Sequence, residues 1–109
     1  MTTPLHITTS QAPDGRPRLT AVGEIDISNT KEFTAKLCDA VAPGHRLLVD
    51  LTLVTYLDSA ALAALFAYAK QIDIHISPLN ETLFSFSGLS QLTTIRVIPA
   101  DQDQPSSAG

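Results

Sequence analysis

The sequence contains one cysteine, few basic residues and no long apolar run, and each shortage excludes a class of protein. Cys38 alone cannot form an internal disulfide or a cysteine-rich zinc site. Seven Lys and Arg residues against eleven Asp and Glu give a formal net charge of −4, which leaves no basic stripe for nucleic-acid phosphates. The apolar runs are too short to span a membrane, and the N-terminus lacks the features of a secretion signal. We therefore expect a cytoplasmic protein without membrane insertion.

Motifs for catalysis, metal binding and phosphate binding are missing as well. The three histidines, His6, His45 and His75, have no motif spacing to a candidate serine nucleophile, and the sequence contains no G-x-S-x-G. No group of His, Cys, Asp and Glu repeats at metal-ligand spacing, and the five glycines form no phosphate-cradling pattern. The sequence thus gives no support to a metal or cofactor site and only weak support to catalysis by a serine nucleophile, so a hydrolase that uses Ser59 is a remote alternative.

The composition is that of one globular domain, with 109 residues of which 44% are hydrophobic and 17% charged. Apolar patterning predicts strands over 5–9, 18–23, 47–51, 72–76 and 94–98. Helical spacing predicts helices over about 29–42, 58–71 and 78–87. The turn residues at 12–17 join the first two strands in a hairpin. We therefore predict a single α/β domain over residues 1–99, with a mixed sheet of about five strands, an N-terminal hairpin and three main helices. The polar residues 100–109 are predicted to form a disordered tail.

The same patterns predict the placement of several side chains. The nearly continuous apolar run at 47–51 is typical of a central strand covered on both faces. Cys38 adjoins the apolar stripe of the first helix and is expected to be buried. Ser77 followed by Pro78 predicts a serine cap for the third helix. The inward stripe of the second helix is predicted to consist of Leu62, Leu65, Phe66 and Ala69.

The most informative segment is 46–70, where a strand pattern changes into a helical one at Asp58 and Ser59 without a pause. Ser59 thus falls on the first turn of a helix, where free N–H groups and the helix dipole favour negative charge. Asp58 is the better N-cap. Ser59 could share the capping, act as a nucleophile, or accept a phosphate that switches a binding surface. A phosphate would add about −1.5 to −2 charges beside Asp58 and repel a docked partner.

A second acidic position precedes the first helix. Glu24 and Asp26 could simply favour the N-terminus of that helix electrostatically. Alternatively, Asp26 lies in a strand-to-helix loop that shares an edge of the sheet with Asp58 and Ser59, provided that the two strands are parallel. An acidic rim of this kind would suit a basic side chain of a protein partner.

Four segments of the chain, in order and over roughly residues 5–98, resemble the STAS domain, and specifically the free-standing anti-sigma factor antagonists of bacteria. The first is similar to the family's G-E-[IL]-D loop, the second to its strand and phosphorylation loop, the third to the start of its third helix, and the fourth to its T/S-G-L. These segments are Gly23–Asp26, Leu48–Ser59, Ser77-Pro78 followed by Leu83-Phe84, and Ser87–Leu89.

The resemblance implies that the fold is STAS-like and that Ser59 is the phosphoacceptor. In such antagonists an anti-sigma factor that is also an ATP-dependent serine kinase phosphorylates this serine. The unphosphorylated antagonist binds that kinase and frees a sigma factor, and a serine phosphatase resets the cycle. The resemblance also implies a role without catalysis, and it assigns partner binding to Asp26, Asp58, Ser59, Ala60 and Ala61.

The chain departs from the family pattern in two places. The usual D-S-[ST]-G is replaced by Asp58-Ser59-Ala60-Ala61, which leaves one hydroxyl and puts a methyl group in place of glycine. The usual glycine-containing turn after the second helix is missing, since Gln71 runs directly into Ile72. The change to Ala60-Ala61 suits an alternative function, that of a constitutive STAS-type accessory or scaffold subunit, for example of a lipid ABC transporter.

Overall fold

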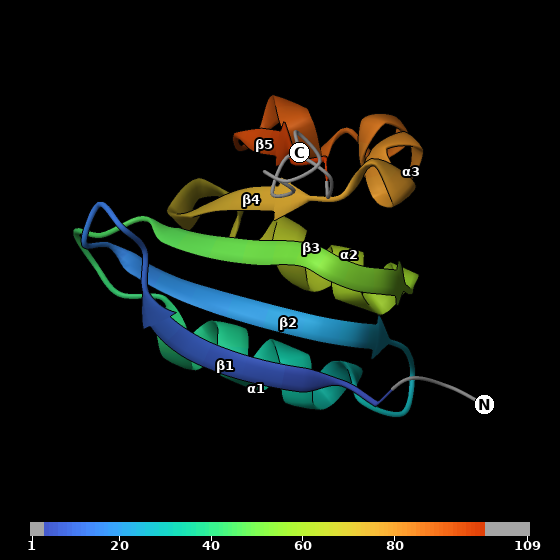
Figure 1. Ribbon diagram of the computed structural model, residues 1–109, viewed down its shortest axis with the longest axis horizontal. Coiled ribbons are helices and arrows are strands. Elements are labelled where there is room, and N and C mark those ends of the chain that lie inside the picture. Colours follow the sequence, from blue (N-terminus) through green and yellow to red (C-terminus); the bar gives the residue numbers. More distant parts are fainter. Residues whose placement is uncertain (1–3, 100–109) are drawn as a thin grey trace, which may run out of the picture.

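The computed structural model describes residues 4–99, which form a five-stranded mixed sheet with the strand order β1-β2-β3-β4-β5 (Figure 1). The strands are β1 (His6–Gln11), β2 (Pro17–Ile25), β3 (Leu47–Leu57), β4 (Ile72–Ile76) and β5 (Ile95–Val97). The helices are α1 (Thr30–Ala40), α2 (Ser59–Ala67) and α3 (Glu81–Ser87), with short 3-10 helices at Ala69–Gln71, Pro78–Asn80 and Leu89–Gln91. Among the four strand pairs of the described sheet, β1–β2 is antiparallel and the others are parallel, so the predicted α/β class and the N-terminal hairpin are confirmed. The predicted tail, 100–109, lies outside the described residues.

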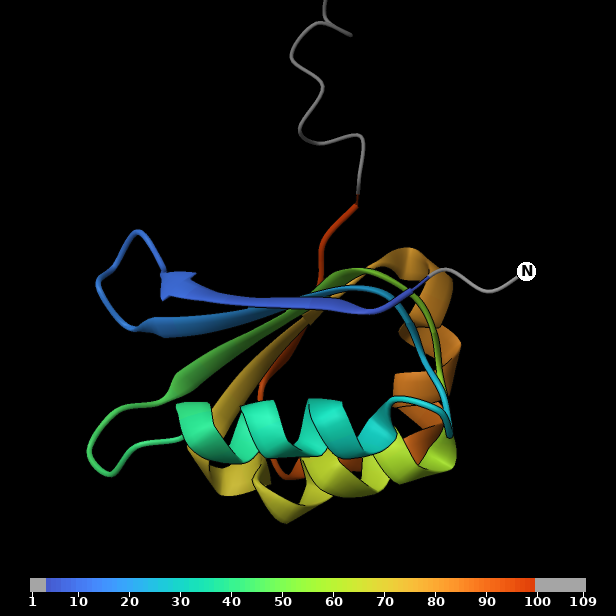
Figure 2. The ribbon, with the colours of Figure 1, turned by 90° about the horizontal axis from the view of Figure 1, so that it is seen from below.

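Helices α1 and α2 pack side by side on one face of the sheet, and α3 lies beyond the end of β4 (Figures 1 and 2). The core lies between this face and the two helices. Alternate residues of β2, Leu19, Ala21 and Ile25, point into it and are fully buried. Phe33 and Leu37 of α1 meet them from the helix side.

The prediction that β3 is covered on both faces is wrong. The opposite face of the sheet carries a polar row in register, Thr20, Asp50, His75 and Arg96, of which the first three are half-buried. Leu48 is nevertheless 5% exposed on that face, because Arg18 and Asp73 flank it in register. Beyond Leu51 the strand continues to Leu57, paired with β2 alone. The long strand therefore ends directly before Asp58.

Two predicted side-chain placements are also wrong, and a third is confirmed in position only. Cys38 is exposed, because it lies about 100° around the helix from the buried Leu37. Phe66 is 37% exposed; α2 ends at Ala67, and its buried positions are Ala61, Ala64 and Leu65. Small residues thus let α2 lie close to the sheet. Ser77 occupies the N-cap position before Pro78, as predicted, but its side chain makes no capping bond to the 3-10 helix that follows it.

Candidate functional site

The turn between β3 and α2 presents Ser59 to solvent. Asp58 has an extended backbone, and its Oδ1 accepts a hydrogen bond of 2.9 Å from the N–H of Ala61. This is the N-cap that the sequence predicts. Ser59 is the first residue of α2 and is exposed. The cap is supplied by Asp58, so the hydroxyl of Ser59 is not required for it.

The loop between β2 and α1 is closed by its own polar side chains. The Oδ1 atom of Asp26 accepts hydrogen bonds from the hydroxyl of Ser28 at 2.6 Å and from its N–H at 3.0 Å. These two bonds lower the pKa of Asp26, so its carboxylate is charged at neutral pH. Asn29 accepts from the N–H of Asp26 at 2.9 Å and donates to the carbonyl of Glu24 at 2.9 Å. The loop therefore holds Asp26 in one orientation and places Ile27, 91% exposed, at its tip.

The two turns lie side by side because β2 and β3 are parallel and end together, with Ile25 paired to Leu57. The N–H of Asp58 donates to the carbonyl of Ile25 at 3.0 Å. Thr30, at the start of α1, reaches both turns: its Oγ1 lies 2.6 Å from the carbonyl oxygen of Asp26 and 3.3 and 3.2 Å from the two carboxylate oxygens of Asp58. The structure thus brings Asp26 to the same edge of the sheet as Asp58 and Ser59. Thr30 belongs to no sequence motif, so its contacts with the two turns cannot be predicted from the sequence.

The two alanines that follow Ser59 differ in accessibility. Ala60 is exposed on the first turn of α2. Ala61 is fully buried, and its methyl group belongs to the hydrophobic core. Ala61 therefore shapes the turn, through the N–H that Asp58 caps, and its side chain is not accessible to a partner. The methyl group that replaces the usual glycine hydrogen does not enlarge the outer surface.

Apolar side chains are exposed around these turns. Tyr56, 51% exposed, lies two residues before Asp58, and Ile27 lies next to Asp26. Leu79 and Phe86, 67% and 86% exposed, follow the end of β4. This segment is attached to β3 by a 2.9 Å hydrogen bond from the side-chain amide of Asn80 to the carbonyl of Val54. We call the surface formed by Asp26, Ile27, Tyr56, Asp58, Ser59 and Ala60 the rim.

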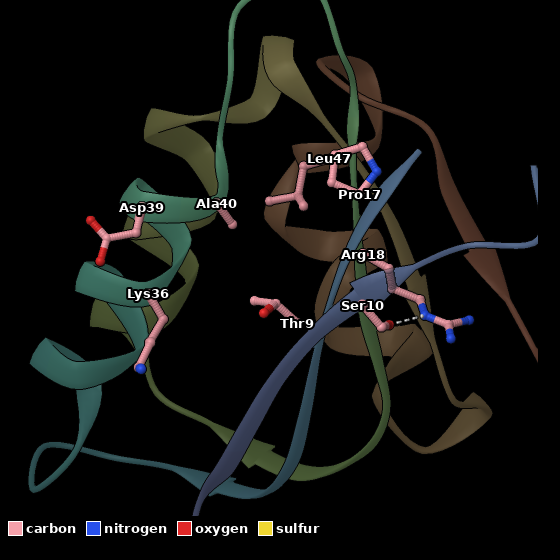
Figure 3. Close-up of a pocket in the computed structure, with 8 residues that line it drawn as sticks. All are labelled: Thr9, Ser10, Pro17, Arg18, Lys36, Asp39, Ala40 and Leu47. Atoms are coloured by element: carbon pink, nitrogen blue, oxygen red, sulfur yellow. Dashed lines mark hydrogen bonds between the residues drawn. The ribbon is translucent and has the colours of Figure 1, made fainter. Parts of the chain in front are cut away.

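A surface groove of about 350 Å³ lies at the opposite end of the sheet, between α1 and the β1–β2 hairpin (Figure 3). Its lining includes Pro17 and Leu47, the first residues of β2 and β3, whereas Ser59 follows the last residue of β3. Arg18 turns away and donates to the hydroxyl of Ser10 at 3.2 Å, and the carboxylate of Asp39 also points outward (Figure 3). The charged groups therefore do not converge on a ligand in this groove.

Metal binding and chemistry at a histidine find little support in the described part of the chain. Within residues 4–99, no three His, Cys, Asp or Glu side chains gather where they could hold a metal ion. His75 lies on β4, beside Asp50 of β3 and away from the rim, and partial burial lowers its pKa. No helix in this range is long and apolar enough to cross a bilayer.

The fold is that of a STAS domain, and the chain belongs to that family. The family model described as "Mlab, STAS domain" matches residues 8–94. No curated protein matches the chain.

Several solved structures are similar to it, and these include the following three. An anti-sigma factor antagonist from Mycobacterium paratuberculosis is 20% identical, with a TM-score of 0.73 over 88% of this chain and 90% of that one. The anti-sigma factor antagonist SpoIIAA, in its unphosphorylated form, is 14% identical, with a TM-score of 0.63 over 84% and 89%. An uncharacterised protein with a SpoIIAA-like fold from Shewanella loihica PV-4 is 16% identical, with a TM-score of 0.61 over 99% and 94%. At these identities the likeness establishes the fold.

Proposed function

We propose that the chain is an anti-sigma factor antagonist that binds an anti-sigma factor with serine kinase activity, releases a sigma factor, and is switched off by phosphorylation of Ser59. A serine phosphatase restores the binding form, and these partners place the protein in the cytoplasm. The chain is a substrate and a binding partner, and performs no catalysis of its own. The observation that carries the proposal is the exposure of Ser59 on the first turn of α2, while Asp58 supplies the cap.

The geometry supports a phosphate that changes binding without unfolding the domain. The first turn of a helix has free N–H groups and a positive dipole end, both of which favour a phosphate. The hydroxyl of Ser59 makes no contribution to the cap, so its modification costs the helix nothing. The added charge of about −1.5 to −2 stands next to Asp58 and close to Asp26.

The chemistry of the rim supports a particular kind of partner surface. The rim combines the carboxylates of Asp26 and Asp58 with the exposed side chains of Ile27 and Tyr56. A complementary surface offers a basic side chain to the acids and an apolar pocket to Ile27. A phosphate on Ser59 adds bulk and charge at the centre of this contact, so it weakens binding.

A pull-down from the native cells tests the proposal. Tagged wild-type protein is expected to retain an ATPase with serine kinase activity. Ser59→Asp is expected to lose that protein, and Ser59→Ala is expected to retain it in the presence of ATP. Equal retention of the kinase by all three proteins would contradict the switch.

Two observations favour a second function, that of a constitutive STAS-type accessory or scaffold subunit, for example of a lipid ABC transporter. The matching family model is that of the Mlab STAS domain. Ala60 also replaces the second hydroxyl of the usual phosphorylation loop. A constitutive subunit would retain a nucleotide-binding membrane complex in the same pull-down, and would do so equally well with Ser59→Asp.

A further inference from the structure

Thr30 lies at the junction of the two turns that form the rim. It is the first residue of α1 and is 9% exposed, so its hydroxyl is shielded from water. Three acceptors surround that hydroxyl: the carbonyl oxygen of Asp26 at 2.6 Å and the carboxylate oxygens of Asp58 at 3.3 and 3.2 Å. A hydroxyl has one proton to donate. Thr30 therefore donates mainly to Asp26 or mainly to Asp58.

The distances and the surrounding bonds make both arrangements accessible. The short contact to Asp26 marks the carbonyl as the acceptor in the unmodified protein. That carbonyl also accepts from the N–H groups of Asn29 at 3.0 Å and Thr30 at 2.8 Å, so it stays paired if the hydroxyl turns away. Asp58 keeps its bond from the N–H of Ala61 in either arrangement. Neither orientation therefore leaves a buried acceptor without a donor.

We propose that Thr30 couples the state of Ser59 to the conformation of the β2–α1 loop. A negative group at Ser59 makes the potential around Asp58 more negative and draws the O–H dipole of Thr30 away from Asp26 and toward Asp58. The proton stays on Oγ1 throughout, and only the hydroxyl rotates. The carbonyl of Asp26 then keeps its bonds from the N–H groups of Asn29 and Thr30 and loses only the bond from the hydroxyl, which changes the surroundings of the loop amides at Ile27 and Ser28. Thr30 is a positioning residue, because it acts through Asp26 and Asp58. The inference rests on the proposed function for the source of the negative group.

A double-mutant cycle read by NMR tests the coupling without a kinase. Ser59→Asp supplies the negative group, and the amide resonances of Ile27 and Ser28 report on the loop. We expect Ser59→Asp to shift these resonances in the wild-type background. The shift should be lost in a Thr30→Val background, which keeps the shape of the side chain but not the hydroxyl. It should be retained in Thr30→Ser, which keeps the hydroxyl.

Thr34 offers a matched control one turn further along α1. Its hydroxyl donates to the carbonyl of Thr30 at 2.9 Å and touches neither turn. Thr34→Val should leave the response of the loop intact. If Thr30→Val fails to fold, Thr30→Ala removes the same hydroxyl and takes its place in the cycle.

The outcomes separate this inference from the proposed function. A full response of Ile27 and Ser28 in the hydroxyl-free background would mean that the charge acts through space, and it would overturn the role of Thr30. Loss of the response in Thr34→Val would overturn it as well. If the loop response depends on the Thr30 hydroxyl but no kinase modifies Ser59, the coupling stands and the phosphorylation switch fails.

Discussion

The two ends of the sheet differ in how their charged side chains are paired. At the end where β4 begins, Asp73 receives bonds from Arg46 at 2.8 Å and Arg16 at 2.5 Å, and Arg46 also donates to the carbonyls of Lys70 and Ile72. At the end where β2 and β3 finish, Asp26 and Asp58 lie close together, and within residues 4–99 neither is paired with a Lys or Arg. The first end, which we call the tied end, is held together by ion pairs to Asp73. The second, which we call the open end, has two carboxylates that form no ion pair with Lys or Arg within residues 4–99. The contrast supports a structural role for the first end and agrees with the proposed partner contact at the second.

The largest expected effect is on binding at the open end. Ser59→Asp should weaken the affinity for the partner kinase about ten- to a hundredfold, because it adds negative charge beside Asp58. Isothermal titration calorimetry measures the affinity, and far-UV circular dichroism should remain unchanged. Ser90→Asp is the control, since Ser90 is an exposed serine on the 3-10 helix before β5. Equal weakening by both substitutions would break the assignment of the rim.

The next effect concerns stability at the tied end. Asp73→Asn should lower the free energy of unfolding by about 1–2 kcal/mol, because the side chain is 18% exposed and loses charge-assisted bonds to two arginines. Urea denaturation measures this change. Asp14→Asn is the matched control, since Asp14 is 61% exposed, pairs with the same Arg16 at 3.2 Å, and should cost little. Equal costs for the two substitutions would remove the distinction between the two ends.

A smaller effect is expected at the tip of the β2–α1 loop. Ile27→Ser should reduce partner affinity by about 1 kcal/mol, because it removes an apolar contact. The free energy of unfolding should change by no more than about 0.5 kcal/mol, since the side chain is 91% exposed. A large loss of stability with unchanged affinity would show that Ile27 serves the fold.

The smallest effect is the acid dependence of the tied end. Burial by itself would raise the pKa of Asp73, but the bonds and charges of Arg46 and Arg16 outweigh it and hold the pKa below its ordinary value of 3.8. The contribution of Asp73 is therefore complete above that value and is lost as pH falls through the lower pKa of the folded state. Urea denaturation at a series of pH values should show this loss in the wild type and not in Asp73→Asn. The same acid dependence in both proteins would assign it to other carboxyl groups.

The sequence predicts the order of elements, the mixed sheet and the exposure of Ser59, because these depend on periodicity and on local rules for turns. It does not predict which side of a helix the rest of the chain covers, so Cys38 and Phe66 were expected to be buried and are exposed. The contacts of Thr30 cannot be predicted from the sequence for a different reason. Its contacts with Asp58 span 28 positions along the chain and exist only once β2 and β3 are paired. Ser77 takes the predicted N-cap position, but its side chain makes no capping bond to the 3-10 helix that Pro78 opens.

Mass spectrometry of the intact protein, after incubation with its partner kinase and ATP, tests the central claim most directly. The wild type should gain one phosphate and Ser59→Ala none, while both proteins bind the kinase before ATP is added. Equal phosphorylation of Ser59→Ala, or a wild type that binds the kinase and stays unmodified, would contradict the account.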